Sequence, residues 1–244
     1  MGNFVSEALL DKREARIRRM FGHIAPSYDL LNHLLSANVD HYWRWRTTRL
    51  VPPRGPAPIL DLCTGTGDLA LAYDRAARGT VPIVGADFCH EMLSRAALKT
   101  QRRGAGGRVR YLEADAQRLP FPDDMFQITC VAFGLRNVTD TDRGLAEMAR
   151  VTKLGGTVAI LEFSKPRHWL FGRAYRFYFR RLLPLVGQLF SHSPDAAYHY
   201  LPASVLEFPD YEALLAKMEQ QGLTTTRYYP FTFGIATLYV GVKE

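Results

Sequence analysis

The chain has 244 residues, of which 47% are hydrophobic and 23% are charged, and its formal net charge is +7. The composition excludes extended disorder, and the length suits one large α/β domain with an added cap rather than two independent domains. The positive charge alone leaves three options open: nucleic acid, an anionic membrane surface, or simple solubility.

Cys63, Cys89 and Cys130 stand apart, without C-x-x-C spacing, so we expect reduced thiols, no disulfide framework and no metal site. The first residues lack the apolar core of a signal peptide. No apolar run reaches the roughly 18 residues of a transmembrane helix. We therefore expect a cytoplasmic protein.

The N-terminal region predicts a helical cap over residues 1–55. A charged amphipathic helix comes first, followed by helix-like spacing over residues 20–36, where Pro26 and Ser27 offer a helix start, and over residues 42–51. Prolines at several positions from 52 to 58 form a rigid linker. The main domain is expected over residues 56–244.

From residue 59 the pattern alternates between strand and helix. Strands are predicted near 59–62, 81–87, 108–113, 126–132 and 156–163, with helices near 67–78, 89–103 and 140–152. This alternation is typical of βαβ crossovers and a mainly parallel sheet. The glycines of the turn at 153–156 are predicted to cap the last of these helices.

After residue 164 the alternation stops. A helical insert is predicted over 167–206, then a helix near 210–221 and two strands, 223–232 and 235–242, joined as a hairpin across Phe233 and Gly234. A hairpin closing a parallel sheet is unlike the second half of a nicotinamide dehydrogenase.

A glycine loop follows the first predicted strand. Gly65 and Gly67 let the backbone turn sharply and approach a ligand. With Ala70 they match the G-x-G-x-x-A pattern of dinucleotide sites, and Asp87 lies where such sites place a ribose-binding acid. The glycines alone therefore leave both dinucleotides and other nucleoside cofactors open.

The charge of this loop favours a different cofactor. Asp61 and Asp68 flank the glycines and would repel a pyrophosphate, which prefers unpaired N–H groups at a helix N-terminus. The same carboxylates would attract the ammonium and sulfonium groups of S-adenosylmethionine. The alternative is that Asp61 only ends a strand and Asp68 only begins a helix.

Further acids follow later strands, at the edge where ligands bind in doubly wound sheets. Asp87 offers two acceptor oxygens to a ribose diol, and Asp115 can accept from an adenine amino group beside the Ala116 N–H. Each acid can instead be a helix N-cap.

Several segments together resemble the ubiquinone/menaquinone biosynthesis C-methyltransferase family. They are Tyr28-Asp29-Leu30-Leu31-Asn32, Asp40 with Trp43-Arg44, Asp61 to Asp68, Phe133 to Val138, Leu161 to Pro166, and Tyr200 to Ser204. The resemblance runs from about residue 20 to the C-terminus. Leu154 stands where the family usually has proline, and Cys63 where it has a small residue.

The resemblance implies a class I S-adenosylmethionine-dependent methyltransferase with a Rossmann-like α/β fold. It implies that Thr66, Asp87, Asp115 and Ala116 contact the cofactor, and that the acceptor is a ring carbon of a prenylated quinol, converting demethylmenaquinol to menaquinol. The ubiquinone equivalent and another small phenol are the alternatives. Nucleic acid is not an expected partner, because the aromatic residues occupy apolar runs instead of basic ones.

Methylation at carbon requires that the neighbouring hydroxyl lose its proton, so the site needs a base or a cation that stabilises a phenolate. We assign this role, as a hypothesis, to Arg136 and Asn137. The alternative is that Arg136 pairs with Asp29 or Asp40. His23 and His33 are the other candidate bases.

Tyr28, Asp29, Asn32 and Asp40 are expected to line the substrate mouth or to close over the cofactor. The segment 169–190 combines aromatic residues with Arg173, Arg176 and Arg180 at helical spacing, which is typical of a helix lying on a membrane surface or of an ordinary lid. The first option would place the protein on the inner face of the membrane. The oligomeric state stays open, with a homodimer as one option.

Overall fold

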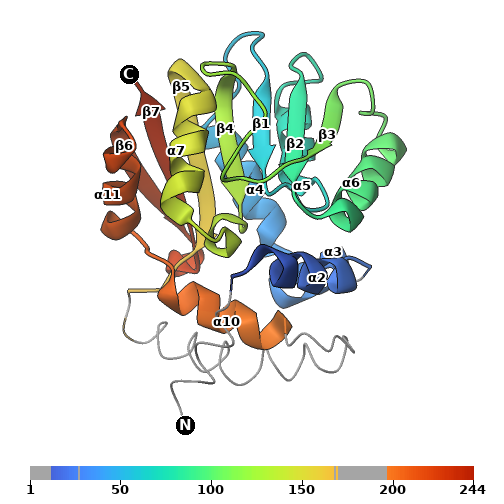
Figure 1. The fold of residues 1–244 in the computed structure, drawn as a ribbon, viewed down its shortest axis with the longest axis vertical. Helices are drawn as coiled ribbons and strands as arrows, with labels where there is room; N and C mark the ends of the chain where they lie inside the picture. The colour runs from blue at the N-terminus through green and yellow to red at the C-terminus, as the bar shows by residue number, and fades with distance from the viewer. Residues whose placement is uncertain (1–11, 27, 168, 170–196) are drawn as a thin grey trace.

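The computed structural model describes residues 12–26, 28–167, 169 and 197–244, and these form a sheet with helices on both faces (Figure 1). The seven-stranded sheet has the order β3-β2-β1-β4-β5-β7-β6. The strands are β1 Ile59–Leu62, β2 Ile83–Asp87, β3 Val109–Glu113, β4 Phe126–Ala132, β5 Thr152–Phe163, β6 Leu223–Phe231 and β7 Ala236–Lys243. Strands β1 to β5 are parallel, whereas β7 is antiparallel to both neighbours.

The predicted crossovers are confirmed. Helices α5 (Asp68–Ala76), α6 (His90–Arg102) and α7 (Thr141–Val151) connect the parallel strands. The N-cap of α7 is Asp140, whose carboxylate accepts the Arg143 N–H at 3.0 Å. This bond satisfies one of the free N–H groups at the helix start and fixes where α7 begins.

The central strands β1 and β4 bury both faces because their side chains alternate between two apolar layers, whereas the edge strands β3 and β6 are partly exposed. Leu60, Leu62 and Val131 pack with α7 and with α11 (Glu212–Gln220). Ile59 and Ile128 pack on the other face, with α5 and α4 (Val39–Leu50). Strands buried on both sides read as continuous apolar runs, which explains why they were recognisable in the sequence.

The predicted glycine turn at 153–156 is wrong. Helix α7 ends at Val151 and β5 begins at Thr152, so both glycines lie inside the strand. Gly155 has φ +71°, and the pairing register with β4 shifts between Phe126 and Ile128. The glycine therefore permits an irregularity in β5 and does not cap a helix.

The C-terminal hairpin is confirmed. Strands β6 and β7 pair antiparallel and are joined by a short 3₁₀ turn, η3 (Thr232–Gly234). Helix α11 precedes them, near the predicted 210–221.

The N-terminal cap contains α2 (Glu14–Ile24), α3 (Tyr28–Leu35) and α4. The helix-like stretch at 20–36 is thus split, and α3 begins beside Pro26 as the sequence indicated. In Figure 1, α2 and α3 lie below the carboxyl ends of the parallel strands, next to α10 (Ala197–Glu207). Trp43 and Val51 share the apolar layer of Ile59, so the end of the cap packs as part of the main core.

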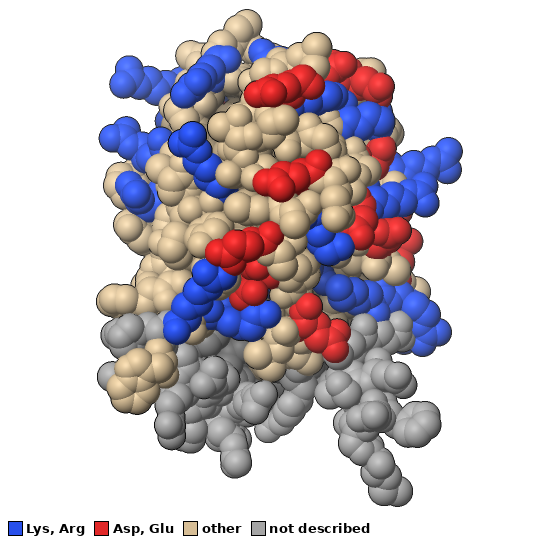
Figure 2. Space-filling model, turned by 90° about the vertical axis from the view of Figure 1, so that its left-hand side faces the viewer, with Lys and Arg blue, Asp and Glu red and all other residues tan. Residues whose placement is uncertain are grey.

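The face that carries α11 and β6 shows basic and acidic side chains interspersed, without one continuous basic patch (Figure 2). No helix among the described residues is long and apolar enough to cross a membrane. Most of the helical insert, including Arg173, Arg176 and Arg180, lies outside the described residues.

Candidate active site

Two adjoining cavities lie between the carboxyl ends of β1 and β4 and the helices α2 and α3. The larger has a volume of about 220 Å³ and the smaller about 60 Å³. They share wall residues from the cap, the glycine loop and β4: Phe21, Tyr28, Cys63, Gly65, Ala132 and Phe133. A molecule in one cavity therefore borders a molecule in the other.

The smaller cavity is lined by Asp87, Asp115, Ala116 and Asn137, together with apolar side chains. Asp87 is buried and accepts the N–H of Gly65 at 2.8 Å on one oxygen and that of Cys89 at 2.9 Å on the other. Because Cys89 is the N-cap of α6, the alternative role of Asp87 as that helix cap is wrong. Burial raises the pKa of Asp87 to about 6, against the effect of its backbone hydrogen bonds.

Asp115 also lines this cavity, and its carboxylate accepts the backbone N–H of Gln117 at 2.9 Å. The Asn137 side-chain oxygen is buried and has no hydrogen-bond partner among the described residues. Buried acceptors in native proteins are normally bonded, so this oxygen is suited to a ligand donor. The lining of the smaller cavity thus includes several side-chain acceptors.

Asp61 turns into the protein. One of its oxygens accepts the Thr64 hydroxyl at 2.5 Å and the Ala70 N–H at 3.0 Å, which places its carboxylate at the N-terminus of α5. The side chain has an exposed fraction of 1%, and burial raises its pKa to about 7 despite the hydrogen bonds from Thr64 and Ala70. Asp61 also forms part of the wall of the larger cavity.

Gly67 is required by the backbone and by packing. Its φ is +84°, it is the N-cap of α5, and the Tyr111 hydroxyl occupies the place that a Cβ would take. Gly67 does not appear among the described wall residues of either cavity. Gly65, with φ +55°, lines both.

An ion network fastens α3 to the core. The Lys99 ammonium lies 2.5 Å from Asp29 and 2.9 Å from Asp68. The Thr66 hydroxyl donates to Asp29 at 2.5 Å and accepts from Lys99 at 3.0 Å. Asp68 also faces the Arg44 guanidinium at 3.7 Å, so two cations of the protein already pair with it. Because Lys99 and Arg44 balance the charge of Asp68, this carboxylate should attract a cationic cofactor only weakly.

The larger cavity has an aromatic wall. Phe133 packs against Trp43 and Phe163, with ring centroids 5.8 Å and 4.5 Å away, and the Trp43 and Phe163 centroids are themselves 6.1 Å apart. The Trp43 indole donates to the Thr232 hydroxyl at 2.8 Å, which ties α4 to the β6–β7 turn. The cavity is therefore shaped for a flat, apolar ligand.

Arg136 lies at the end of β4, in the turn η1 (Leu135–Asn137), and lines the larger cavity. Its Nη1 donates to Glu162 at 3.0 Å, and the exposed fractions of these two side chains are 7% and 0%. The alternative pairing with Asp29 or Asp40 is therefore wrong. The Arg136 Nε is buried and has no hydrogen-bond partner among the described residues, so its N–H is a donor without an acceptor in that part of the protein.

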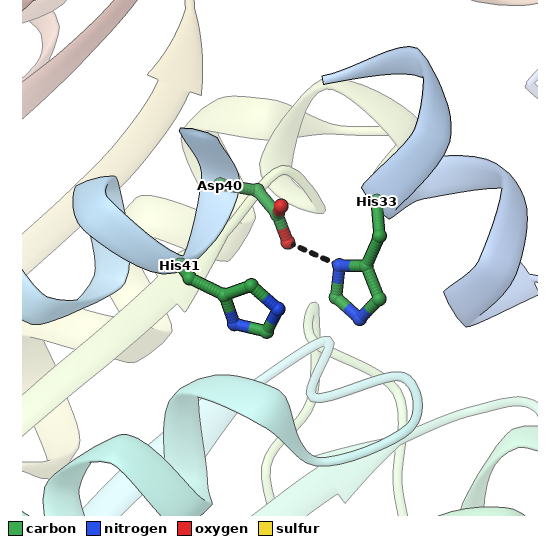
Figure 3. Close-up of side chains that lie close together, drawn as sticks. All are labelled: His33, Asp40 and His41. Atoms are coloured by element: carbon green, nitrogen blue, oxygen red, sulfur yellow. Dashed lines mark hydrogen bonds and ion pairs between the residues drawn. The ribbon is translucent and has the colours of Figure 1, made fainter. Parts of the chain in front are cut away.

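Asp40 lies at the far end of the larger cavity, in a cluster with His33 and His41 (Figure 3). It accepts from His33 Nδ1 and from the Ser36 hydroxyl, both at 2.8 Å, and from the Arg44 guanidinium. Burial works to raise its pKa, but the Arg44 charge and these bonds outweigh burial and hold the pKa below its usual value. A metal ion at this cluster would meet a cation, Arg44, already bound to the same carboxylate.

The remaining candidates divide between the cavities and the surroundings. Tyr28 lines both cavities and Asn32 lines the larger one, whereas Asp29 and the candidate base His33 do not appear among the described wall residues. Burial raises the Tyr28 pKa. Sequence reasoning missed the contributions of Arg44, Lys99, Glu162 and Tyr200; only the segments containing Arg44, Glu162 and Tyr200 had been noted.

Comparison with known proteins agrees with this geometry. The model of the ubiE/COQ5 methyltransferase family matches residues 9–243. A ubiquinone/menaquinone biosynthesis C-methyltransferase from Geobacter sulfurreducens is 47% identical, over 96% of this chain and 91% of that protein. A demethylmenaquinone methyltransferase from Thermus thermophilus is 49% identical, over 91% of this chain and 99% of that protein.

Solved structures show the same fold. An S-adenosylmethionine-dependent methyltransferase from Thermotoga maritima, a possible histamine N-methyltransferase, superposes with a TM-score of 0.66 at 17% identity, covering 92% of this chain and 98% of that one. The chain belongs to the ubiE/COQ5 methyltransferase family, and it is a methyltransferase with the class I Rossmann-like fold of S-adenosylmethionine-dependent enzymes.

Proposed function

We propose that the protein transfers the methyl group of S-adenosylmethionine to a ring carbon of demethylmenaquinol, a prenylated quinol, and so forms menaquinol. The observation that carries this proposal is the pair of adjoining cavities: a small one edged with acceptors and a larger aromatic one that contains Arg136. The names of two relatives support it: one is a ubiquinone/menaquinone biosynthesis C-methyltransferase and the other a demethylmenaquinone methyltransferase.

We propose that the residues lining the smaller cavity recognise the nucleoside part of the cofactor. We assign Asp87 to the ribose hydroxyls, and Asp115 with the Ala116 N–H to the adenine edge. Asn137 was predicted to act with Arg136 on the phenolate, but it lines the smaller cavity and not the larger one, so we assign its unpartnered oxygen to a donor of the cofactor. When bound, S-adenosylmethionine supplies an electrophilic methyl group on a sulfonium. Gly65 lines both cavities and marks where the cofactor passes toward the acceptor.

Two of the other predicted cofactor residues, Asp61 and Thr66, line the larger cavity, whereas Gly67 lines neither cavity. Asp61 stabilises the start of α5 and adds negative potential to the wall of the larger cavity. Thr66 holds the loop to Asp29, and Gly67 permits the turn. We propose that these residues shape the cofactor site, and that Asp29 and Asp40 position the cap helices around Tyr28 and Asn32.

Arg136 is proposed to favour the phenolate of the acceptor. Glu162 offsets part of the guanidinium charge and fixes its position, while the free Nε–H is available to a ring oxygen. A phenolate pushes electron density onto the neighbouring carbon, which then attacks the methyl group in line with its bond to sulfur.

The first experiment is calorimetry with S-adenosylmethionine, followed by a methyl-transfer assay with quinols of different head groups. We expect transfer to a naphthoquinol with a prenyl side chain. Preference for a benzoquinol would shift the assignment to ubiquinone synthesis, and preference for a soluble phenol would reject the prenylated acceptor.

A second experiment tests Arg136. Arg136→Lys keeps the charge but loses the planar Nε–H donor, so kcat should fall at least about 10-fold with unchanged affinity for S-adenosylmethionine. The control is Arg150→Lys, because Arg150 is held by Glu147 and Asp123 in a carboxylate network outside both cavities. Unchanged kcat with lower stability in Arg136→Lys would reject the catalytic role.

A lipophilic acceptor also leads us to propose peripheral contact with a membrane surface. Trp169 and Phe233, with exposed fractions of 69% and 70%, are apolar side chains at the start of the insert and in the β6–β7 turn. Phe233 follows Thr232, which lines the larger cavity. Exposed aromatic side chains near a lipid-binding cavity are suited to the membrane interface.

Flotation with liposomes that contain anionic lipid tests this contact. Phe233→Ser and Trp169→Ser should each reduce the bound fraction. The control is Leu154→Ser, because Leu154 is 66% exposed but lies near the start of β5, at the opposite end of the sheet. Equal binding by all three variants and the unmodified protein would reject docking through these residues.

A further inference from the structure

Tyr200 lies on α10 and lines the larger cavity, together with Arg136 and Phe163. Its exposed fraction is 2%, and its hydroxyl is buried without a hydrogen-bond partner among the described residues. A buried hydroxyl that loses water and gains no partner is destabilising, so native proteins rarely keep one without a function.

Another tyrosine provides the comparison. The Tyr73 hydroxyl is also buried and without a partner within the described chain, but Tyr73 packs between α5 and the sheet, away from the described walls of both cavities. An unpartnered hydroxyl is thus not sufficient evidence of a ligand. What distinguishes Tyr200 is its place in the wall of a cavity that is also lined by Arg136, whose buried Nε likewise has no partner among the described residues.

The electrostatic surroundings agree with a hydrogen-bond donor. Burial raises the pKa of Tyr200 to about 12, although the nearby charge of Arg136 works in the opposite direction. Tyr200 therefore keeps its proton at neutral pH, and a neutral phenol can donate to an oxygen of a ligand.

We propose that Tyr200 binds the acceptor, donating its hydroxyl proton in a hydrogen bond to an oxygen on the acceptor ring. The inference rests on the proposed function, in which the larger cavity holds a quinol with an oxygen at each end of the ring. Arg136 and Tyr200 would then hold the ring through its oxygens, fixing which carbon faces the methyl group. This makes Tyr200 a substrate-binding residue and not a proton-transfer group.

The test compares Tyr200→Phe with Tyr73→Phe, since both changes remove only one hydroxyl. For Tyr200→Phe we expect KM for a short-chain demethylated naphthoquinol to rise about 5- to 10-fold, with unchanged affinity for S-adenosylmethionine. Tm should stay the same or rise, because an unpaired hydroxyl is removed. Tyr73→Phe should show the same trend in Tm and leave KM unchanged.

Direct binding of the same naphthoquinol, measured by fluorescence quenching under reducing conditions, separates this inference from the proposed function. If the unmodified enzyme binds the quinol without methylating it, the proposed function fails, whereas weaker binding by Tyr200→Phe still supports the inference. If Tyr200→Phe and Tyr73→Phe bind the quinol as tightly as the unmodified enzyme, the inference is overturned. A lower Tm for Tyr200→Phe alone would also overturn it, by assigning the hydroxyl to the fold.

Discussion

Arg136 Nη1 lies 3.0 Å from Glu162 Oε2, and this contact joins the end of β4 to the end of β5 inside the protein. The backbone N–H groups of Arg136 and Phe163 also donate to the same carboxylate, at 3.2 Å and 3.1 Å. Glu162 therefore organises the turn that presents Arg136 to the larger cavity. A buried charge pair of this kind is sensitive to the loss of one partner.

Glu162→Gln should lower the free energy of unfolding by about 3 to 5 kcal/mol, because it leaves the Arg136 charge buried without its counterion. Urea denaturation measures the loss. The double variant Arg136→Met with Glu162→Leu removes both charges and should lose less stability than Glu162→Gln. A double variant that is less stable than Glu162→Gln would contradict the explanation that the loss comes from the buried, unpaired charge of Arg136.

Asp61 gives a pH-dependent prediction. Burial raises its folded-state pKa to about 7 from a usual value of 3.8, so the folded state binds this proton more tightly than the unfolded state does. The stability of the unmodified protein relative to Asp61→Asn should then fall as pH rises from about 4 to 7, by at most about 1.4 kcal/mol per pH unit. Above pH 7 the difference should be constant.

Asp87→Asn serves as the companion measurement, because burial raises the Asp87 pKa only to about 6. The difference in stability between the unmodified protein and Asp87→Asn should stop changing near pH 6, which is a lower pH than for Asp61→Asn. Urea denaturation from pH 4.5 to 8 records both curves. A flat difference for both variants would show that these carboxyl groups titrate equally in the folded and unfolded states.

The ion pairs of Lys99 should hold α3 against the core of the protein. Lys99→Met breaks the contacts to Asp29 and Asp68, so amide hydrogen exchange should become faster over residues 28–35. Lys217→Met is the control, because Lys217 pairs with Asp142 at 2.7 Å on the surface between α11 and α7. Exchange over 28–35 should not change in that variant. Equal exchange in both variants would mean that the network does not hold α3.

Gly67→Ala should destabilise the protein, since alanine is strained at φ +84° and its Cβ would meet the Tyr111 hydroxyl. Adding Tyr111→Phe removes that oxygen and should restore part of the stability, while the backbone strain remains. Thermal unfolding of the single and double variants measures the restored fraction. No restoration would assign the whole loss to the backbone.

The sheet could be predicted because its central strands are local apolar runs and each crossover helix has its own apolar face. The side-chain partners at the strand ends could not, because they depend on which strands become neighbours. Arg136 pairs with Glu162 since β4 lies beside β5, whereas the sequence suggested Asp29 or Asp40. Gly155 was misread because a left-handed glycine serves equally at a helix end or within an irregular strand.

The same limit applies to the site. Asp87, Asp115 and Ala116 were found from their positions after strands, and they do line one cavity. Asp61 and Asp68 were also placed correctly along the chain, but the hydrogen bonds of Asp61 and the two cations beside Asp68 appear only in three dimensions. The roles of these residues and the division of the chain near residue 55 stay predictions.

Phe21 of α2 and Tyr28 of α3 line both cavities, so one pair of helices forms part of the wall of each. With the methyl donor in one cavity and the acceptor in the other, as we propose, a displacement of these helices that lets one molecule leave would also change the contacts of the other. Any effect of the donor on the affinity for the acceptor must then be matched, by the same factor, by an effect of the acceptor on the affinity for the donor. Exchange of product for substrate would in that case depend on the occupancy of the neighbouring cavity.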